Sequence, residues 1–146
     1  MRALLQRVSR AEVRVAGEPV GAIGRGLLVL LGVAPEDDDA AADALARRVV
    51  ELRIHEDRDG RTNLALGEIG GAVLVVSQFT LYGDVWSGRR PSFVRSAGYE
   101  DGERLYDLFV DALRPLVRGV ETGVFGAHME VELVNDGPVT LVIDAQ

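Results

Sequence analysis

Residues 24–33 have the sequence GRGLLVLLGV, and this stretch indicates where the centre of the fold lies. Residues 27–33 form a continuous apolar run, which is typical of a strand buried on both faces. Ahead of it, residues 11–15 alternate between apolar and charged side chains and predict a half-buried strand. Residues 20–23 predict a short return strand, because turn signals lie on both sides of them. We therefore expect a sheet with residues 27–33 near its middle.

Two helices are expected after this run. Aspartates at positions 37–39 suit the positive N-terminal end of a helix, and apolar residues then recur at helical spacing as far as Leu52. A second apolar stripe begins near Asp101, and Pro115 is expected to end that helix close to Arg114. Between the two helices, residues 72–76 predict another apolar strand.

The rest of the chain is expected to form loops and a final pair of strands. Residues 55–63 and 83–97 are polar or rich in Gly, Ser, Arg and Pro, and both predict loops. Residues 129–134 and 139–143 predict two strands joined by a turn, because Asp-Gly between them is a strong hairpin signal. With roughly six or seven strands and two helices, the pattern favours an α+β fold over an array of βαβ units. We expect a single domain over residues 1–146, with a mostly antiparallel, curled or barrel-like sheet and both helices packed on it.

Composition excludes several classes of protein. The 146 residues include no cysteine, which excludes a disulfide scaffold, a thiolate nucleophile and a Cys-based zinc site. The two histidines lie far apart and no nucleotide-binding glycine motif is present, so neither a metal nor a cofactor is expected. The absence of a signal peptide and of a membrane-spanning run predicts a cytoplasmic protein without a membrane partner. The net charge of −7 disfavours extensive contact with nucleic acid, because phosphate binding depends on a surplus of basic side chains.

The first segment with reactive groups is Ser77-Gln78-Phe79-Thr80, at the end of the strand expected at residues 72–76. Its hydroxyls, side-chain amide and backbone N–H groups are of the kind that polarise a carbonyl and hold an oxyanion. A hydroxyl nucleophile normally needs a neighbouring base, and no histidine is close in sequence. Taken alone, the pattern fits a strand end whose Ser and Thr cap a turn better than a catalytic site.

The second candidate segment is Asn135-Asp136-Gly137-Pro138-Val139-Thr140. A plain turn explains this composition. The alternative is a rigid corner that presents backbone carbonyls to a ligand, since proline fixes the backbone and removes a donor.

The third candidate segment is a basic patch on an otherwise acidic chain. Arg89, Arg90 and Arg95 lie within seven positions, with Phe93 and Trp86 nearby. Such a loop either is solvated, with its arginines paired to carboxylates, or holds a phosphate and stacks on a base.

Five segments occur together, in order, along the chain: MRALLQRVSRAEVRV, GAIGRGLLVLLGV, SQFTLYGD, GRRPSF and VNDGPVT. In this combination the sequence closely resembles the bacterial D-aminoacyl-tRNA deacylase family, also called D-Tyr-tRNA deacylase. The resemblance extends to about residue 144 and includes the two family motifs, SQxT and GPxT. It implies a homodimeric, cofactor-free hydrolase that cleaves the ester at the 3′ end of D-aminoacyl-tRNA.

The resemblance also implies roles for individual residues. Gly137 and Pro138 are expected to share a cis peptide, to enter the partner chain's pocket and to grip the substrate's α-amino group, so that an L-side chain meets the backbone. Gln78 and the backbone N–H of Phe79 are expected to stabilise the oxyanion, and the Phe79 ring to stack on the terminal adenine. Thr80 is expected to position a water rather than to attack, and Ser77 to support the pocket. Val139 and Thr140 are expected to complete the binding motif, and Arg7 to brace the Gly-Pro corner. Contacts with the tRNA are expected from Arg89, Arg90 and Phe93.

Three rival interpretations remain open, and the third, a purely structural homodimer, has no positive support in the sequence. Some eukaryotic relatives in this family are associated with DNA-replication origins, so the alternative is a homodimer that binds nucleic acid without deacylase activity. The acidic net charge argues against duplex DNA as its partner. The second rival is a related editing module that acts on a mischarged L-aminoacyl- or glycyl-tRNA. The intact GPVT motif favours chiral proofreading, although glycine has no side chain for the corner to exclude.

Overall fold

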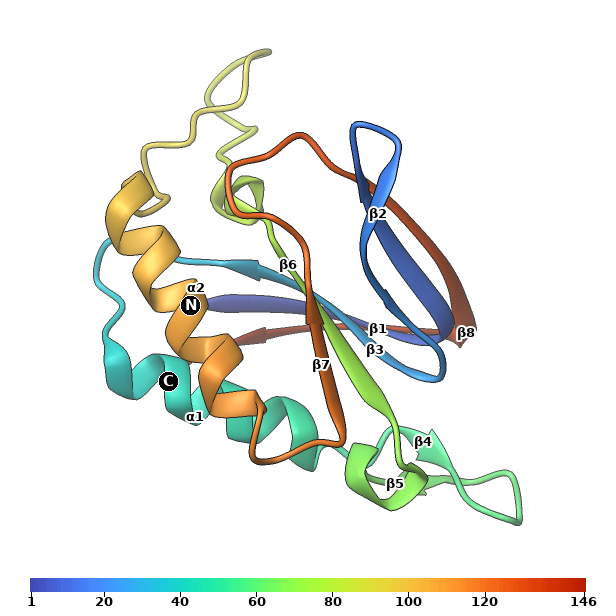
Figure 1. The fold of residues 1–146 in the computed structure, drawn as a ribbon. Coiled ribbons are helices and arrows are strands. Elements are labelled where there is room, and N and C mark those ends of the chain that lie inside the picture. The colour runs from blue at the N-terminus through green and yellow to red at the C-terminus, as the bar shows by residue number, and fades with distance from the viewer.

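The computed structural model describes all 146 residues, and its framework is a six-stranded sheet built on one long strand, β1 (Arg2–Val15). Three strands pair with β1 in antiparallel fashion. β2 (Glu18–Ile23) and β3 (Gly26–Gly32) share one edge of β1, and β8 (Glu130–Asp144) runs along the other edge. Figure 1 shows β1 and β8 side by side on the right of the molecule. The length of β1 therefore determines how the sheet is assembled.

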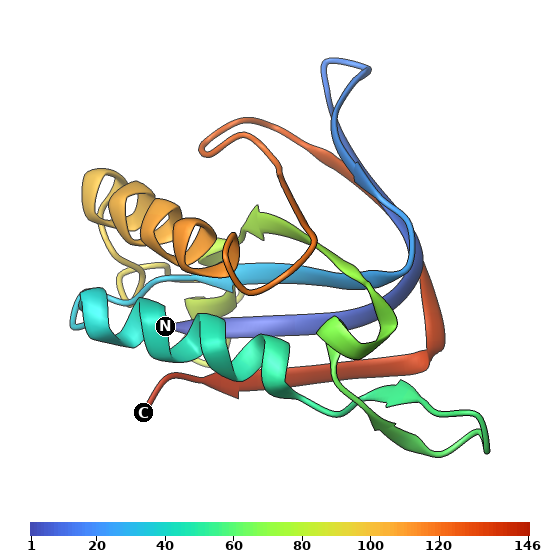
Figure 2. The ribbon, with the colours of Figure 1, turned by 60° about the horizontal axis from the view of Figure 1, so that its bottom comes forward.

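β3 lies near the middle of the sheet, as its apolar sequence predicts. It is buried at six of its seven residues and separates β1 from β6 (Ala72–Ser77), which runs parallel to β3. β7 (Gly119–Thr122) then extends the sheet in parallel with β6. The sheet curls until β2 approaches β7. The two strands are so close that a Cβ built on Gly21 would lie only 2.5 Å from the Thr122 carbonyl oxygen. The expected α+β fold with a mostly antiparallel, barrel-like sheet is confirmed (Figure 2).

Two helices, α1 (Asp39–Glu51) and α2 (Tyr99–Leu113), lie side by side against one face of this sheet (Figures 1 and 2). Between them and alternate residues of β1, β3 and β6 lies the main core, with Phe109 at its centre. The other residues of these strands face a smaller apolar cluster inside the curl. No helix in the chain combines the length and the apolar character needed to cross a membrane.

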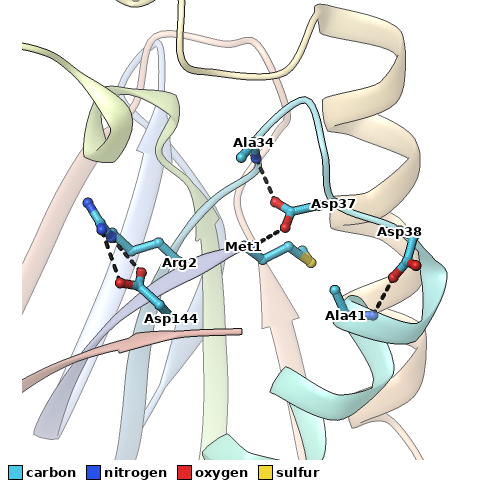
Figure 3. A network of polar contacts seen from close by, with 7 residues as sticks. All are labelled: Met1, Arg2, Ala34, Asp37, Asp38, Ala41 and Asp144. Carbon is cyan, nitrogen blue, oxygen red and sulfur yellow. Dashed lines mark hydrogen bonds and ion pairs between the residues drawn. The ribbon is translucent and has the colours of Figure 1, made fainter. Parts of the chain in front are cut away.

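The predicted helix ends are confirmed. Asp38 caps α1 by accepting a hydrogen bond from the Ala41 N–H at 2.9 Å, and Asp37 accepts from the Ala34 N–H at 2.6 Å and from the amine of Met1 (Figure 3). α2 begins two residues before the expected position and ends at Leu113, just ahead of Pro115. The ends of the sheet are tied nearby, since Arg2 donates two hydrogen bonds to the Asp144 carboxylate at 2.6 and 3.0 Å.

Three expectations for individual segments are wrong. The first strand begins at Arg2 rather than at residue 11. Residues 55–63 do not form a plain loop, because β4 (His55–Glu56) and β5 (Thr62–Leu64) pair as a small hairpin. In addition to the three errors, the structure contains short elements for which the sequence analysis made no prediction: β7 and the 3₁₀ helices η1 (Leu66–Ile69) and η2 (Phe79–Tyr82).

The third error concerns the C-terminus, where the expected hairpin is absent. β8 is one continuous strand of 15 residues that pairs with β1 on both sides of the Asp-Gly sequence. Local turn propensity is overridden because β1 is long enough to pair with both halves. The register passes from Asn135 opposite Val8 to Thr140 opposite Gln6, so residues 136–139 bulge out of the ladder.

Gly26 provides a test of the close contact between β3 and β6. A Cβ on this residue would lie 1.9 Å from the Ala72 carbonyl oxygen, which belongs to the backbone and cannot swing away. We expect Gly26→Ala to lower the free energy of unfolding by about 1–3 kcal/mol, measured by urea denaturation. Gly24→Ala is the matched control, because no heavy atom lies within 4 Å of its Cβ position. Its effect should stay within about 0.5 kcal/mol, and equal losses in the two variants would contradict this description of the β3–β6 contact.

Candidate active site

The Ser77-Gln78-Phe79-Thr80 segment lies where β6 ends and η2 begins. The Gln78 N–H donates to the Leu31 carbonyl at 2.8 Å, which keeps the segment attached to β3 for one residue beyond β6. The Gln78 side-chain amide donates to Thr80 Oγ1. Phe79 is the first residue of η2, so its backbone N–H has no partner within that helix. Two amide donors and a hydroxyl are thus presented at the end of a rigid, buried strand.

Contacts from distant segments hold this turn in place. The Gly83 N–H donates to the Thr80 carbonyl at 3.0 Å, and the Ser96 hydroxyl donates to the Phe79 carbonyl at 2.8 Å. The Phe79 ring remains 57 % exposed and meets Phe93 edge to face, with the ring centroids 5.1 Å apart. Because both backbone carbonyls are engaged, the donors keep their orientation before any ligand binds.

No general base is hydrogen-bonded to these groups. The hydrogen-bond partner of Thr80 Oγ1 is the Gln78 amide, which is a donor and accepts no proton. The nearest carboxylate in sequence, Asp84, accepts hydrogen bonds from the Ser87 hydroxyl at 2.6 Å and the Trp86 N–H at 2.9 Å. These hydrogen bonds hold the pKa of Asp84 below its ordinary value. Thr80 is therefore not activated as a nucleophile in this arrangement.

An apolar pocket of about 520 Å³ opens beside the segment. Its walls come from the ends of β3 and β6, the start of α2 and the loop that precedes β8. Ser77, Gln78 and Phe79 form one side, and Phe125 and Tyr99 belong to the opposite elements, with their rings 5.1 Å apart. Ten of the sixteen lining residues are hydrophobic, which suits a flat aromatic group held beside a few polar atoms.

The Gly137-Pro138-Val139-Thr140 segment forms the bulge of β8. Asn135 spans its base, because its side-chain oxygen accepts from the Val139 N–H at 2.9 Å and its amide donates to Thr140 Oγ1 at 2.8 Å. The Gly137–Pro138 peptide is cis and both residues are exposed. Gly137 has a φ of 137°, a conformation that favours glycine. The bulge is thus an ordered corner that projects from the strand.

Arg7 braces this corner from below. The residue is only 5 % exposed, and its Nε donates to the Asp136 carbonyl at 2.8 Å while Nη1 donates to the Ile54 carbonyl at 2.7 Å. Nη2 lies 3.7 Å from the Glu56 carboxylate. A buried cation is tolerated only when its donors are satisfied, so Arg7 fixes the corner and the β4–β5 hairpin together.

His55 lies next to this cluster and has no hydrogen-bond partner. It is 1 % exposed, and neither ring nitrogen contacts a donor or acceptor. Burial, followed by the positive charges of Arg25 and Arg7, lowers the pKa of His55 to about 4, although Asp136 acts in the opposite direction. His55 is therefore neutral at neutral pH.

The predicted residues fall into two separate groups within one chain. Ser77 lies opposite Leu31, and Leu31 lies opposite Ala3, whereas the corner adjoins Arg7 on the other edge of β1. The groups are separated by the three strand spacings from β6 to β8 and by the four residues from Ala3 to Arg7 along β1. These two offsets combine to a distance on the order of 20 Å. Phe93 joins the first group through Phe79, whereas Arg89 and Arg90 lie farther out in the same exposed loop.

Several residues of the two groups were missed in the sequence. Phe125 and Tyr99 carry no local signal of their roles, because the pocket walls meet only in the folded chain. Asn135 and Thr140 flank the Gly-Pro pair in the sequence, and this spacing is the one indication that their side chains could hydrogen-bond across the base of the corner. No cluster of three or more His, Asp or Glu side chains is placed to hold a metal ion.

Comparison with known proteins identifies one family. A family model described as D-Tyr-tRNA(Tyr) deacylase matches residues 4–144. The D-aminoacyl-tRNA deacylase of Symbiobacterium thermophilum is 62 % identical over 146 residues, which cover 100 % of this chain and 97 % of that protein. The D-aminoacyl-tRNA deacylase of Desulfatibacillum aliphaticivorans is 57 % identical and is covered in full, as is this chain.

Two solved structures share the fold. One is named c-Myc DNA Unwinding Element Binding Protein, is 39 % identical, and superposes with a TM-score of 0.94 over 100 % of this chain and 99 % of that chain. The other is described as a probable eukaryotic D-amino acid tRNA deacylase and is 22 % identical, with a TM-score of 0.84 over 98 % of both chains.

The burial of His55 predicts a pH dependence of stability. Between the ordinary pKa of 6.5 and the lowered value of about 4, the unfolded chain binds a proton that the folded chain does not. Because protonation then favours the unfolded chain, the free energy of unfolding is unaffected by His55 above pH 6.5. It falls as the pH drops toward 4, by at most about 3 kcal/mol. His55→Phe fills similar space without a titrating group, so its free energy of unfolding should fall less across this window.

Urea denaturation at a series of pH values from 7 to 4 measures this difference. The same substitution at the exposed His128 is the control and should follow the wild type. Parallel losses of stability in wild type and His55→Phe would show that His55 is not kept neutral by folding.

Proposed function

The chain belongs to the D-Tyr-tRNA(Tyr) deacylase family, hydrolases that cleave the ester bond of D-aminoacyl-tRNA, and we propose that residues 77–80 form its catalytic centre. The observation that carries this proposal is a set of oriented amide donors, none of them hydrogen-bonded to a general base, beside an apolar pocket that His128 also lines. Such a site suits an ester that is already activated. It needs stabilisation of the oxyanion more than it needs a strong nucleophile.

The oxyanion is held by amide groups in this mechanism. The Gln78 side-chain amide and the Phe79 N–H donate to the oxygen that becomes negative when water attacks the ester carbonyl. The tetrahedral intermediate then collapses, the C–O bond to the ribose breaks, and the proton from water ends on the leaving ribose oxygen through the neighbouring free hydroxyl. Thr80 orients the water through its backbone carbonyl, which retains a free lone pair beside the Gly83 N–H.

The apolar pocket suits the terminal adenosine of the tRNA. A purine is flat and mostly apolar, and Phe125 offers an aromatic face on the far wall. The exposed face of Phe79 offers a second stacking surface at the rim. Ser77 lines the same wall and supports it from the end of β6. Substrate contact at one end of the tRNA is compatible with the net charge of −7, because few phosphates need to be neutralised.

The Gly-Pro corner serves as the chirality filter of a partner protomer's site. Within one chain it projects away from residues 77–80, and it is exposed and braced by Arg7, Asn135 and Thr140. Inserted into a second copy, the carbonyls of Gly137 and Pro138 would hold the α-amino group, with Val139 completing the corner. An L-side chain would then collide with backbone, whereas a D-side chain or the hydrogen of glycine would not.

The free edge of β8 supports a homodimer. β8 pairs with β1 alone and carries exposed apolar residues, among them Val134, Leu141 and Val142. A long unpaired strand edge of this kind is normally covered. A C2 dimer would cover it and would complete two equivalent sites. Because aminoacyl-tRNA is made and used where translation occurs, we place this activity in the cytoplasm.

DNA binding is the rival function, since one protein of the same fold is named for a DNA element. The acidic net charge disfavours it, because nonspecific affinity for duplex DNA depends on neutralising phosphates. Measurable affinity for duplex DNA at low salt, in a protein that cleaves no aminoacyl ester, would favour the rival.

Release of tyrosine from matched D-Tyr-tRNA and L-Tyr-tRNA tests the proposed chemistry. Wild type should hydrolyse the D-ester and leave the L-ester intact. Thr80→Ala should lose less than about tenfold in kcat, because its backbone carbonyl remains, whereas Gln78→Ala should lose about 10²-fold or more. Loss of all activity in a well-folded Thr80→Ala variant would establish its hydroxyl as the nucleophile and overturn the water mechanism.

A further inference from the structure

The loop between η2 and α2 projects from the end of the molecule opposite the β4–β5 hairpin (Figure 1). Its tip, residues 85–91, carries Trp86, whose side chain is 95 % exposed, together with the exposed Arg89 and Arg90. An indole this exposed contributes nothing to the core, so the stability of the fold does not account for it.

The tip is ordered by its own hydrogen bonds. The backbones of Asp84 and Ser92 exchange two hydrogen bonds at 2.8 and 2.9 Å, which close the loop at its base. The Asp84 carboxylate accepts from the Trp86 N–H and the Ser87 hydroxyl inside the loop. A closed base and an internal anchor reduce the conformational freedom that binding would otherwise remove.

The base of the loop is attached directly to the catalytic segment. Phe93 packs on Phe79, and Ser96 donates to the Phe79 carbonyl. From Phe93 to Arg89 the chain can span at most about 14 Å. A stacked nucleic-acid strand rises about 3.4 Å per nucleotide, so the tip can reach roughly four nucleotides beyond a terminal adenosine bound at Phe79. In a tRNA the first three of these are the unpaired nucleotides of the 3′ end.

The charges of the tip are available for a ligand. Arg89 and Arg90 make no ion pair with the chain, whereas arginines of the sheet and helices such as Arg10, Arg47 and Arg104 are paired with carboxylates. Unpaired guanidinium groups beside an exposed aromatic ring match a strand whose phosphates and base faces are both open. In a duplex the base faces are stacked and closed to an indole, so single-stranded nucleotides fit the tip better.

Building on the deacylase function, we propose that residues 85–91 bind the unpaired nucleotides next to the terminal adenosine of the tRNA. Trp86 stacks on one of these bases, and Arg89 and Arg90 contact the flanking phosphates. The loop then acts as a second anchor that recognises tRNA beyond the aminoacylated nucleotide.

Two substrates separate this anchor from the catalytic site: D-Tyr-tRNA and D-Tyr-adenosine, which lacks the other nucleotides. Trp86→Ala and the double variant Arg89→Ala/Arg90→Ala should lower kcat/KM for D-Tyr-tRNA about 5- to 100-fold, mainly through KM. Their kcat/KM for D-Tyr-adenosine should stay within about twofold of wild type, because no contact has been removed. The arginine variant should also weaken the salt dependence, with a log–log slope shallower by about 1.4 for two phosphates on a single strand.

Arg58→Ala/Arg61→Ala is the matched control, because both arginines are exposed in the β4–β5 hairpin at the opposite end of the molecule. It should behave as wild type on both substrates. Equal losses on the two esters would show that the loop only supports the catalytic segment, and unchanged activity on D-Tyr-tRNA would show that it does not touch the nucleotides. Dissociation into monomers in either loop variant would show that the tip contacts the second protomer rather than the tRNA. Each of these three results overturns the proposal. A wild type inactive on both esters would instead overturn the deacylase function itself.

Discussion

Arg7 holds together the parts of this fold on which the proposed selectivity depends. Its guanidinium is buried beside β1 and donates to carbonyls of two segments, Asp136 ahead of the Gly-Pro corner and Ile54 ahead of the β4–β5 hairpin. Loss of either acceptor would leave a buried donor unsatisfied, which is far more costly than the loss of an exposed ion pair. The corner is consequently held in place before any substrate binds, and the steric filter that we propose requires that rigidity.

The length of β1 explains why the corner exists at all. A strand of 14 residues pairs with both halves of β8, so the Asp-Gly-Pro segment cannot reverse the chain and is extruded as a bulge. Extrusion gives the segment exposure, while Asn135 and Arg7 restore hydrogen bonds that the ladder no longer supplies. The same register places the corner on the far edge of β1 from residues 77–80, which is why the proposed site requires two chains to bring its halves together.

The sequence predicts the parts of this structure that depend on local periodicity. β3, α1 and α2 follow from apolar runs and stripes, and Asp38 and Pro115 mark helix ends correctly. The C-terminal hairpin fails because turn propensity at Asp136-Gly137 is weaker than pairing with a distant strand. The pocket wall from Phe125 and Tyr99 escapes prediction for the same reason, since it is assembled from segments far apart in the chain. Local composition marks residues 77–80 and 137–140 as candidate segments, but only the resemblance to a family implies specific roles for their residues.

Complementation between two inactive variants tests most directly whether the site is shared between protomers. Gln78→Ala keeps a native corner, and Gly137→Val, whose side chain would clash with Arg7 and Val139, keeps native residues 77–80. In a heterodimer one site then combines both native halves, so random mixing should restore about a quarter of wild-type activity on D-Tyr-tRNA. If heterodimers form, as native mass spectrometry would show, and the mixture stays as inactive as its components, the site does not combine halves from two chains.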